Sequence, residues 1–307
     1  MPDRTGGAVV TAAAPGDRER TAERLLRSTA SRSYDPDIDI DWSAPLADGK
    51  GFMLAHRCSL HGTQLWEGLS PQQRIELGKH EIASIACTGI WLEFVLLRLL
   101  AKVAYEGDPA SRHVQYALAE MAEECRHSTM FARLVERLGV PFYHPPATLH
   151  ALGRLLPAIA RGPALWGAVL LGEELTDRIQ REQVDDETIQ PLIRMVNRIH
   201  ILEEARHIGF ARAELTRTAA AVPRAELPYH RAVLGRVGFL IARNLIRPGV
   251  YQAVGLDPRA ARRAALANPY HQQTIRFSGE KVMAFLGDAG MVGPPVTHLW
   301  RRSFLLG

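Results

Sequence analysis

The sequence predicts an all-α protein built on a four-helix bundle, with additional C-terminal helices and an extended N-terminal arm. Three observations support this prediction: helix start and stop signals are frequent, strand signals are poor, and two distant segments repeat the same polar motif. The repeated segments read EECRH from Glu123 and EEARH from Glu203. A chain of 307 residues that is 47% hydrophobic can bury a large core, so we expect a single domain overall.

The bundle is predicted between residues 70 and 218. Ser70 followed by Pro71 combines an N-cap with a proline at the first helical position, and Asp108 followed by Pro109 repeats this signal. A Pro-rich connection separates the second helix from the third. The four helices are expected at about residues 71–105, 109–139, 163–184 and 191–218.

Three segments flank or cover this bundle. Residues 1–32 are predicted to be a disordered tail. Residues 33–69, where Ile alternates with Asp before a run of loop residues, are predicted to be an extended arm on the surface. Residues 219–307 are predicted to form additional helices that pack on the bundle. These helices are expected to begin near Leu227, Asp257 and Asn268.

Composition excludes several classes of protein. The most apolar stretch contains Glu93, Arg98 and Lys102, so it fails as a membrane span and is expected to be a buried helix. No signal peptide is recognisable, and three cysteines in no metal-binding spacing suit a reducing cytoplasm. The net charge of +4 comes without a basic run interleaved with aromatics. We therefore expect a cytoplasmic protein that binds neither membranes nor nucleic acid.

Two of the predicted helices carry metal-binding residue types on one face. His200, Glu204 and His207 stand at i, i+4 and i+7 on the fourth helix, within an arc of about 60°. Glu124 and His127 form a Glu-x-x-His motif on an inward face of the second helix. Burying these groups inside a bundle is costly unless a cation compensates them.

The first and third helices each supply an inward-facing acid. Glu93 lies in an apolar helical segment. In the third helix Glu173 shares its face with Trp166, whereas Glu174 shares its face with Arg178, so we choose Glu173 and keep Glu174 as the alternative. The predicted metal ligands are Glu93, Glu124, His127, Glu173, His200, Glu204 and His207.

This ligand set predicts a site for two metal ions. Two Glu-x-x-His helices with one Glu from each remaining helix is the pattern of ferritin-like di-iron carboxylate bundles, so the fold is predicted to be a ferritin-like four-helix bundle. Carboxylates and imidazoles suit iron or manganese, and the set contains no thiolate. Asp177 is predicted to accept a hydrogen bond that orients a ligand histidine. No further catalytic residue and no organic cofactor site is predicted.

The other histidines and the aromatic residues of the bundle are not predicted to bind metal. Trp91, Phe131, Trp166 and Phe210 could line a substrate cavity, although aromatics at helical spacing are more often core residues. Nine histidines show no paired spacing and are expected in loops or on the surface: His56, His61, His80, His113, His144, His150, His230, His271 and His298.

With these motifs the chain resembles the p-aminobenzoate N-oxygenase family of non-haem di-iron oxygenases, whose arylamine N-oxygenase members act in antibiotic biosynthesis. The resemblance runs from SYDPDIDIDW through GIWLEFVLL, AEECRHSTMFARL and LGEELTDRIQRE to HILEEARHIGFA. His200 distinguishes this pattern from ferritins, desaturases and ribonucleotide reductase small subunits, which resemble it with two histidines. Two departures are visible: Glu123 stands where an Asp is common, and the stretch from His127 to Glu173 looks shorter, which bears on the substrate cavity.

The resemblance implies a cofactor, a reaction and partners. Two iron ions held by the seven residues would use O2 to convert a small-molecule amine to a hydroxylamine, nitroso or nitro product. Because the sequence lacks a flavin or nicotinamide fingerprint, electrons are expected from an external ferredoxin or flavin reductase. The family also implies a homodimer. Manganese stays open, because the same ligands bind it.

Two other functions are open on the same residues. A di-iron C–H hydroxylase, desaturase or aldehyde-processing oxygenase would share the metal ligands, and the substrate is not legible from the sequence. A ferritin-like iron-binding protein would be a non-enzymatic alternative. The helices after residue 218 and the long arm before Ser70 fit a storage shell poorly.

Overall fold

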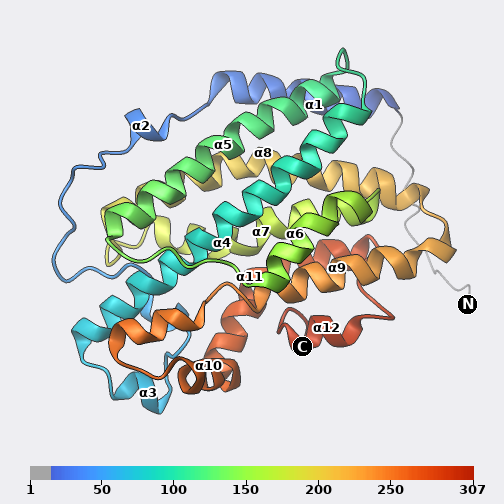
Figure 1. The fold of residues 1–307 in the computed structure, drawn as a ribbon. Helices are drawn as coiled ribbons and strands as arrows, with labels where there is room; N and C mark the ends of the chain where they lie inside the picture. The colour runs from blue at the N-terminus through green and yellow to red at the C-terminus, as the bar shows by residue number, and fades with distance from the viewer. Residues whose placement is uncertain (1–14) are drawn as a thin grey trace, which may run out of the picture.

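The computed structural model describes residues 15–307, which form an all-α helical bundle with no β-strand within that range (Figure 1). The predicted all-α class is confirmed, and the ferritin-like connection order stays a prediction. Its four long helices are α4 (Pro71–Glu106), α5 (Arg112–Leu138), α7 (Pro163–Val184) and α8 (Pro191–Ala221). The pairs α4–α5 and α7–α8 each pack along their length.

The helix caps explain where these helices begin. Ser70 and Gln73 form a capping box at the start of α4, as the sequence predicts. The second helix begins at Arg112, three residues later than predicted. Asp108 is the reason, because its side chain accepts from the amide of Ala110 at 2.9 Å and forms a turn. Ser111 then caps α5.

The connection between α5 and α7 contains a helix that the sequence analysis missed. The predicted Pro-rich connection includes α6 (Ala147–Ile159), which packs on α4. Its prolines obscured the helix, but Pro146 is the N-cap residue, and the Gly153 carbonyl that Pro157 leaves without an amide donor accepts from the Arg98 guanidinium at 2.7 Å. Leu149 and Leu156 are buried and anchor α6 to the core.

The prediction of a disordered tail over residues 1–32 is wrong for residues 15–31. They form α1 (Pro15–Ser31), which packs against α5 and α8 (Figure 1). Ala22 and Leu25 are buried in this contact, and the Arg18 guanidinium donates to Glu214 at 3.0 Å. Residues 1–14, the rest of the predicted tail, lie outside the described residues.

The predicted arm, residues 33–69, is largely irregular but only partly superficial. It contains three short helices, α2 (Pro36–Asp39), η1 (Ala55–Arg57) and α3 (Gln64–Glu67). Phe52, Met53 and Leu54 are buried in it. The Gly51 amide donates to Thr188 at 2.9 Å, which ties the arm to the α7–α8 connection.

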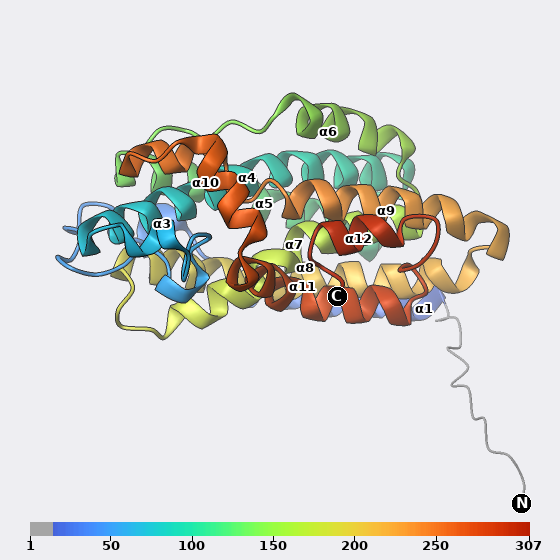
Figure 2. The ribbon, with the colours of Figure 1, turned by 90° about the horizontal axis from the view of Figure 1, so that it is seen from below.

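The C-terminal helices cover one side of the bundle, as predicted. Helices α9 (Leu227–Ala242) and α11 (Pro269–Asp288) pack on α7, and Figure 2 shows them in front of the bundle. Helix α10 (Pro258–Ala267) precedes α11, and the unpredicted α12 (Thr297–Arg302) buries Trp300 against α9. The short 3-10 helix η2 (Arg224–Glu226) precedes α9, and the seven-residue 3-10 helix η3 (Pro248–Val254) connects α9 to α10.

Helix α4 combines great length with a strongly apolar stretch. It is long and apolar enough to cross a membrane by length and composition alone, but 67% of its most apolar window is buried inside the fold. This burial is the pattern of a core helix, the role that the sequence analysis assigned to it.

Glu81 of α4 is a buried carboxylate that accepts hydrogen bonds from the arm, and its ionisation can be tested. Glu81 is fully buried and accepts from the Ser59 amide at 2.9 Å, and the Ser59 hydroxyl lies 2.9 Å from the Tyr251 hydroxyl. Burial raises the pKa of Glu81 from its ordinary value of 4.5 to about 7. The folded state therefore binds this proton more tightly than the unfolded state does.

Replacing Glu81 with Gln should change how stability depends on pH. The raised pKa means that Glu81 lowers the free energy of unfolding as pH rises from 4.5 to about 7, by about 3 kcal/mol in total. Glu81→Gln removes this loss, so its stability relative to the unmodified protein should increase across that range. Denaturant unfolding at several pH values measures the difference, and a pH-independent difference would contradict this account.

Candidate metal centre

The structure brings all seven predicted ligand residues together inside the bundle. Each is at most 5% exposed. Helix α4 contributes Glu93, α5 contributes Glu124 and His127, α7 contributes Glu173, and α8 contributes the remaining three. Three overlapping groups each have ligand atoms within 4.8 Å of one another: Glu124, His127, Glu204 and His207; Glu93, His127 and His200; and Glu93, Glu124 and Glu173.

Glu204 and Glu124 occupy the centre of this cluster. Glu204 Oε1 lies 3.2 Å from His127 Nδ1, 3.3 Å from His200 Nε2 and 3.5 Å from His207 Nδ1. Glu124 lies between two of the same rings, 3.0 Å from His127 Nδ1 and 2.6 Å from His207 Nδ1. The nitrogens that face the carboxylates are therefore Nδ1 of His127 and His207 and Nε2 of His200.

The cluster fits a pair of divalent cations. Unpartnered buried polar atoms each cost about 1–3 kcal/mol, and several ligand atoms here have no hydrogen-bond partner. Four carboxylates also carry four negative charges when ionised, which two divalent cations would balance. The ligand atoms that approach one another without a well-directed hydrogen bond, or have no polar neighbour, are Glu124 Oε1, Glu173 Oε1, His200 Nε2, both carboxylate oxygens of Glu204, and His207 Nδ1.

The same crowding shifts the ionisation of individual groups. Burial, with the nearby carboxylates Glu124 and Glu204, raises the pKa of Glu93 well above its usual range. Burial and Glu204 do the same to the pKa of Glu173. Burial lowers the pKa of His200 to about 4, which keeps its imidazole neutral at neutral pH. A neutral imidazole is the form that binds a metal.

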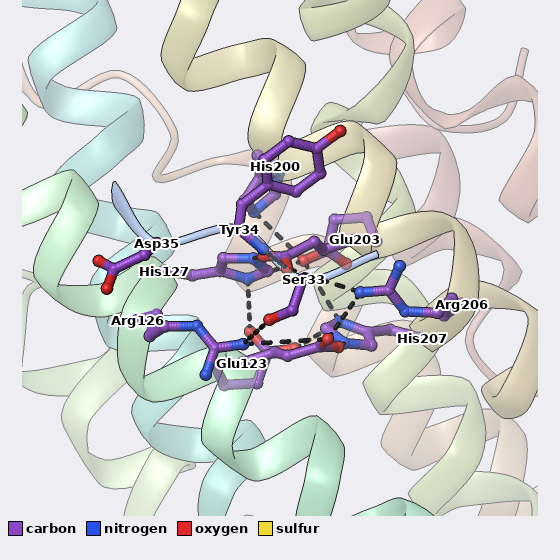
Figure 3. A network of polar contacts seen from close by, with 12 residues as sticks. Ser33, Tyr34, Asp35, Glu123, Arg126, His127, His200, Glu203, Arg206 and His207 are labelled. Carbon is purple, nitrogen blue, oxygen red and sulfur yellow. Dashed lines mark hydrogen bonds and ion pairs between the residues drawn. The ribbon is translucent and has the colours of Figure 1, made fainter. Parts of the chain in front are cut away.

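The two acids of each repeated pair have different neighbours (Figure 3). Glu123 of α5 lies 2.8 Å from His207 Nε2 of α8, and Glu203 of α8 lies 2.9 Å from His127 Nε2 of α5. The first acid of each pair therefore contacts the ring nitrogen that faces away from the cluster. This contact fixes the ring orientation and leaves Nδ1 directed at the metal position.

The outer acids Glu123 and Glu203 have polar partners of their own. The Arg206 guanidinium donates to Glu123 at 2.6 Å, and the backbone amide of Tyr34 in the arm donates to Glu203 at 3.1 Å. Arg126 contacts the Ser33 hydroxyl at 3.1 Å and so holds the arm against α5. The arginine of each EE-x-RH repeat thus supports this outer layer of the site.

The prediction that Asp177 orients a ligand histidine is wrong. Asp177 accepts from the Arg181 guanidinium at 2.8 and 2.9 Å, one turn along α7, and that pairing satisfies its charge. Gln180 takes the predicted place, because its amide oxygen lies 2.9 Å from His200 Nδ1. Glu174 forms an ion pair with Arg212, so the structure places Glu173 rather than Glu174 in the cluster.

Sequence reasoning missed several polar residues around the cluster. Glu123, Glu203 and Gln180 were not assigned, although the first two stand in the repeated motif and Gln180 follows Glu173 by seven residues on the same face. Glu120, one turn before Glu124, is also buried, and burial raises its pKa to about 8. The expectation of surface or loop positions is wrong for four buried histidines: His80, His113, His230 and His271.

Two cavities meet at the cluster, on either side of Leu92 and Gly172. The Asn197 cavity is lined by Glu93, Glu173 and His200, with Phe131, Thr176, Gln180, Asn197 and Leu245 among its other walls. The Trp91 cavity reaches the same two glutamates through walls that include Trp91, Val237 and Ile241. Trp166 and Phe210 lie in the core instead.

Comparison with known proteins identifies the family. Residues 15–290 match the family model described as p-aminobenzoate N-oxygenase AurF. The chain belongs to this family. The family match includes α1 and the arm as well as the four bundle helices, so the segments that support the outer acids lie within the shared region.

Relatives of the chain occur in mycobacteria. The uncharacterized protein Rv0885 of Mycobacterium tuberculosis and the uncharacterized protein Mb0909 of Mycobacterium bovis are each 32% identical to it over 195 residues. The aligned part covers 61% of this chain and 57% of each relative, so the chain matches less than two thirds of their length.

Metal content should separate the ligands from their neighbours. Iron-loaded wild-type protein is expected to hold two ions per chain, and His200→Ala, Glu204→Ala and Glu173→Gln should each hold fewer. Glu174→Gln is the matched control, because Glu174 pairs with Arg212 outside the cluster. Plasma mass spectrometry after anaerobic loading measures the ratio, and equal iron in the Glu173 and Glu174 variants would refute the assignment.

The outer acids should tune metal affinity without being ligands. Glu203→Gln keeps the size of the side chain but removes the charge that faces His127, so metal affinity is expected to fall about 10- to 100-fold. Glu182→Gln is the control, because Glu182 forms a partly exposed ion pair with Arg57 at the surface. Competition with a coloured chelator gives the affinity, and equal values in the two variants would remove this role.

Proposed function

We propose that the protein is a di-iron oxygenase that uses O2 to N-oxygenate a small amine. The observation that carries the proposal is the clustering of His200 with the two Glu-x-x-His motifs in a chain of the N-oxygenase family. A third imidazole is what separates this pattern from two-histidine ferritin-like proteins. In this proposal the metals are iron and the product enters secondary metabolism such as antibiotic biosynthesis.

The reaction requires electrons from outside the chain. One oxygen atom of O2 forms the N–O bond of the hydroxylamine, and the other leaves as water after uptake of two electrons and two protons. When bound, the irons would supply the redox chemistry that activates O2. A ferredoxin or flavin reductase would supply the electrons, because the sequence carries no flavin or nicotinamide fingerprint.

The chain's own residues would position the amine and keep bulk water out. A substrate in the Asn197 cavity would lie against Glu93, Glu173 and His200, and the other walls of this cavity are mainly apolar. Thr176 and Asn197 are the polar side chains in this lining that are neither ligands nor partners of ligands. They are suited to hydrogen bonds with an amine, a hydroxyl or an amide.

The lining also favours an uncharged substrate. Within residues 15–307, no Lys or Arg lines the Asn197 cavity or the Trp91 cavity. A carboxylate buried there would have no cation to pair with and would face the acidic ligands Glu93 and Glu173. The proposed substrate class is therefore a largely apolar amine without a carboxylate, such as an arylamine, rather than an amino acid or aminobenzoate.

Turnover of matched amines tests both parts of the proposal. Iron-loaded, reduced protein should convert 4-methylaniline to N-oxygenated products, with kcat/KM more than about tenfold above that for p-aminobenzoate, because the carboxylate loses its hydration without a partner. Product mass spectrometry with 18O2 locates the new oxygen. Carbon hydroxylation in place of nitrogen oxygenation would support the C–H hydroxylase alternative, and iron uptake without turnover of any amine would support an iron-binding protein.

A further inference from the structure

The Trp91 cavity is a small space beside the metal centre, enclosed by four helices. Helices α4, α6, α7 and α9 each supply part of its wall. Its volume is about 20 Å³, whereas one buried water needs roughly 10–15 Å³. The cavity therefore has room for a molecule slightly larger than a water.

The wall of this cavity is almost entirely hydrocarbon. Glu93 and Glu173 supply its carboxylates, and Trp91 is the other lining residue with a polar atom in its side chain. Every remaining lining residue is aliphatic or is Gly172. A buried water needs several polar partners, and away from the two glutamates the wall offers only the Trp91 indole. Cavities with such walls stay dry and bind apolar molecules.

Gly172 of α7 leaves space open where the Trp91 cavity meets the Asn197 cavity. A Cβ at this position would have no atom within 4 Å apart from the backbone of its own helix. Gly172 lies in the interior of that helix, where Gly is less favourable than Ala. The helix therefore gives up stability at a position where a methyl group would fit.

Helix packing does not account for Gly172. Gly167, five residues earlier on α7, does have a packing role, because a Cβ there would lie 2.8 Å from the Leu234 side chain of α9. Gly172 has no such neighbour. What its missing side chain provides is open space beside the candidate ligand Glu173.

The opening at Gly172 leads directly to the candidate ligands. Leu92 and Gly172 line both cavities, and so do Glu93 and Glu173. Glu173 Oε1 is buried without a hydrogen-bond partner. A small molecule that passes Gly172 therefore lies against the carboxylates at the metal position.

We propose that the Trp91 cavity holds O2 and that the space beside Gly172 is the opening through which O2 reaches the metal position. The inference rests on the proposed function, which consumes O2. O2 is small, uncharged and apolar, so it matches both the volume and the hydrocarbon wall of the cavity. An amine is better suited to the other cavity, where Thr176 and Asn197 supply hydrogen-bonding groups. The two reactants thus approach the same glutamates from separate cavities.

Nuclear magnetic resonance under O2 pressure tests the binding site without an amine. The full-length chain is loaded with zinc, which is diamagnetic, so that O2 is the paramagnetic species that speeds methyl relaxation. The methyls of Val169 and Val237, which line the cavity, should relax several-fold faster with O2. Those of Val114 and Val282, which are comparably buried but line neither metal-side cavity, should change far less.

Gly172→Ala tests the opening. The added methyl group should occupy this space without weakening the helix, since Ala is favoured over Gly there. The iron-loaded, reduced variant should keep the iron content of the wild type, but O2 should oxidise it several-fold more slowly, as measured by stopped-flow absorbance without an amine. Gly287→Ala on α11 is the matched control, because a Cβ there also has no atom within 4 Å and Gly287 lines neither cavity. It should be oxidised at the wild-type rate.

The outcomes separate this proposal from the proposed function. No selective relaxation at Val169 and Val237, or equal oxidation rates in the Gly172 and Gly287 variants, would overturn the O2 site. Selective relaxation that Gly172→Ala abolishes, together with slower oxidation of that variant, would support it. Failure of the proposed function gives a different result, in which O2 still relaxes these methyls selectively but no amine yields an N-oxygenated product.

Discussion

Compensation of buried negative charge is the constraint on which the architecture depends. Glu93, Glu124, Glu173 and Glu204 lie in the bundle interior, where an isolated carboxylate is unstable. Imidazoles and metal cations can balance these groups at the centre. Around them, Glu123 and Glu203 orient the rings, and Arg206 and the arm in turn balance those outer acids. The polar groups of the candidate ligands are thus paired by the outer acids, and the outer acids are paired in turn by Arg206 and the arm.

This layered arrangement explains why segments far outside the bundle belong to the same fold. The arm reaches Glu203 through a backbone amide at Tyr34, so its path is fixed by a hydrogen bond to the site rather than by its own secondary structure. Helix α1 plays a comparable part further along α5 and α8, where Arg18 pairs with the buried Glu214. The family match beginning at residue 15 agrees with this dependence.

The sequence predicted the parts of the molecule that depend on local chemistry. The capping residue Ser70 and the helix-face positions of Glu124 and His127 follow from spacing alone, because i to i+3 residues share a helix face. Helix α1 was missed because its stability comes from burying Ala22 and Leu25 against other helices, which no local pattern reveals. The error at Asp177 has a similar cause: Asp177 and Gln180 are both polar residues of α7, and only the fold shows that Asp177 pairs with Arg181 whereas Gln180 faces His200.

The candidate metal ligands and the cavity walls are largely different sets of residues. The candidate ligands come from four helices that lie within the region matched by the family. The cavity walls include Val237, Ile241 and Leu245, which belong to α9 and the segment after it, and these positions can change without disturbing a ligand. Most walls of both cavities are bundle residues such as Leu92 and Gly172, so substrate choice in the proposed reaction would depend on the bundle and on α9 together.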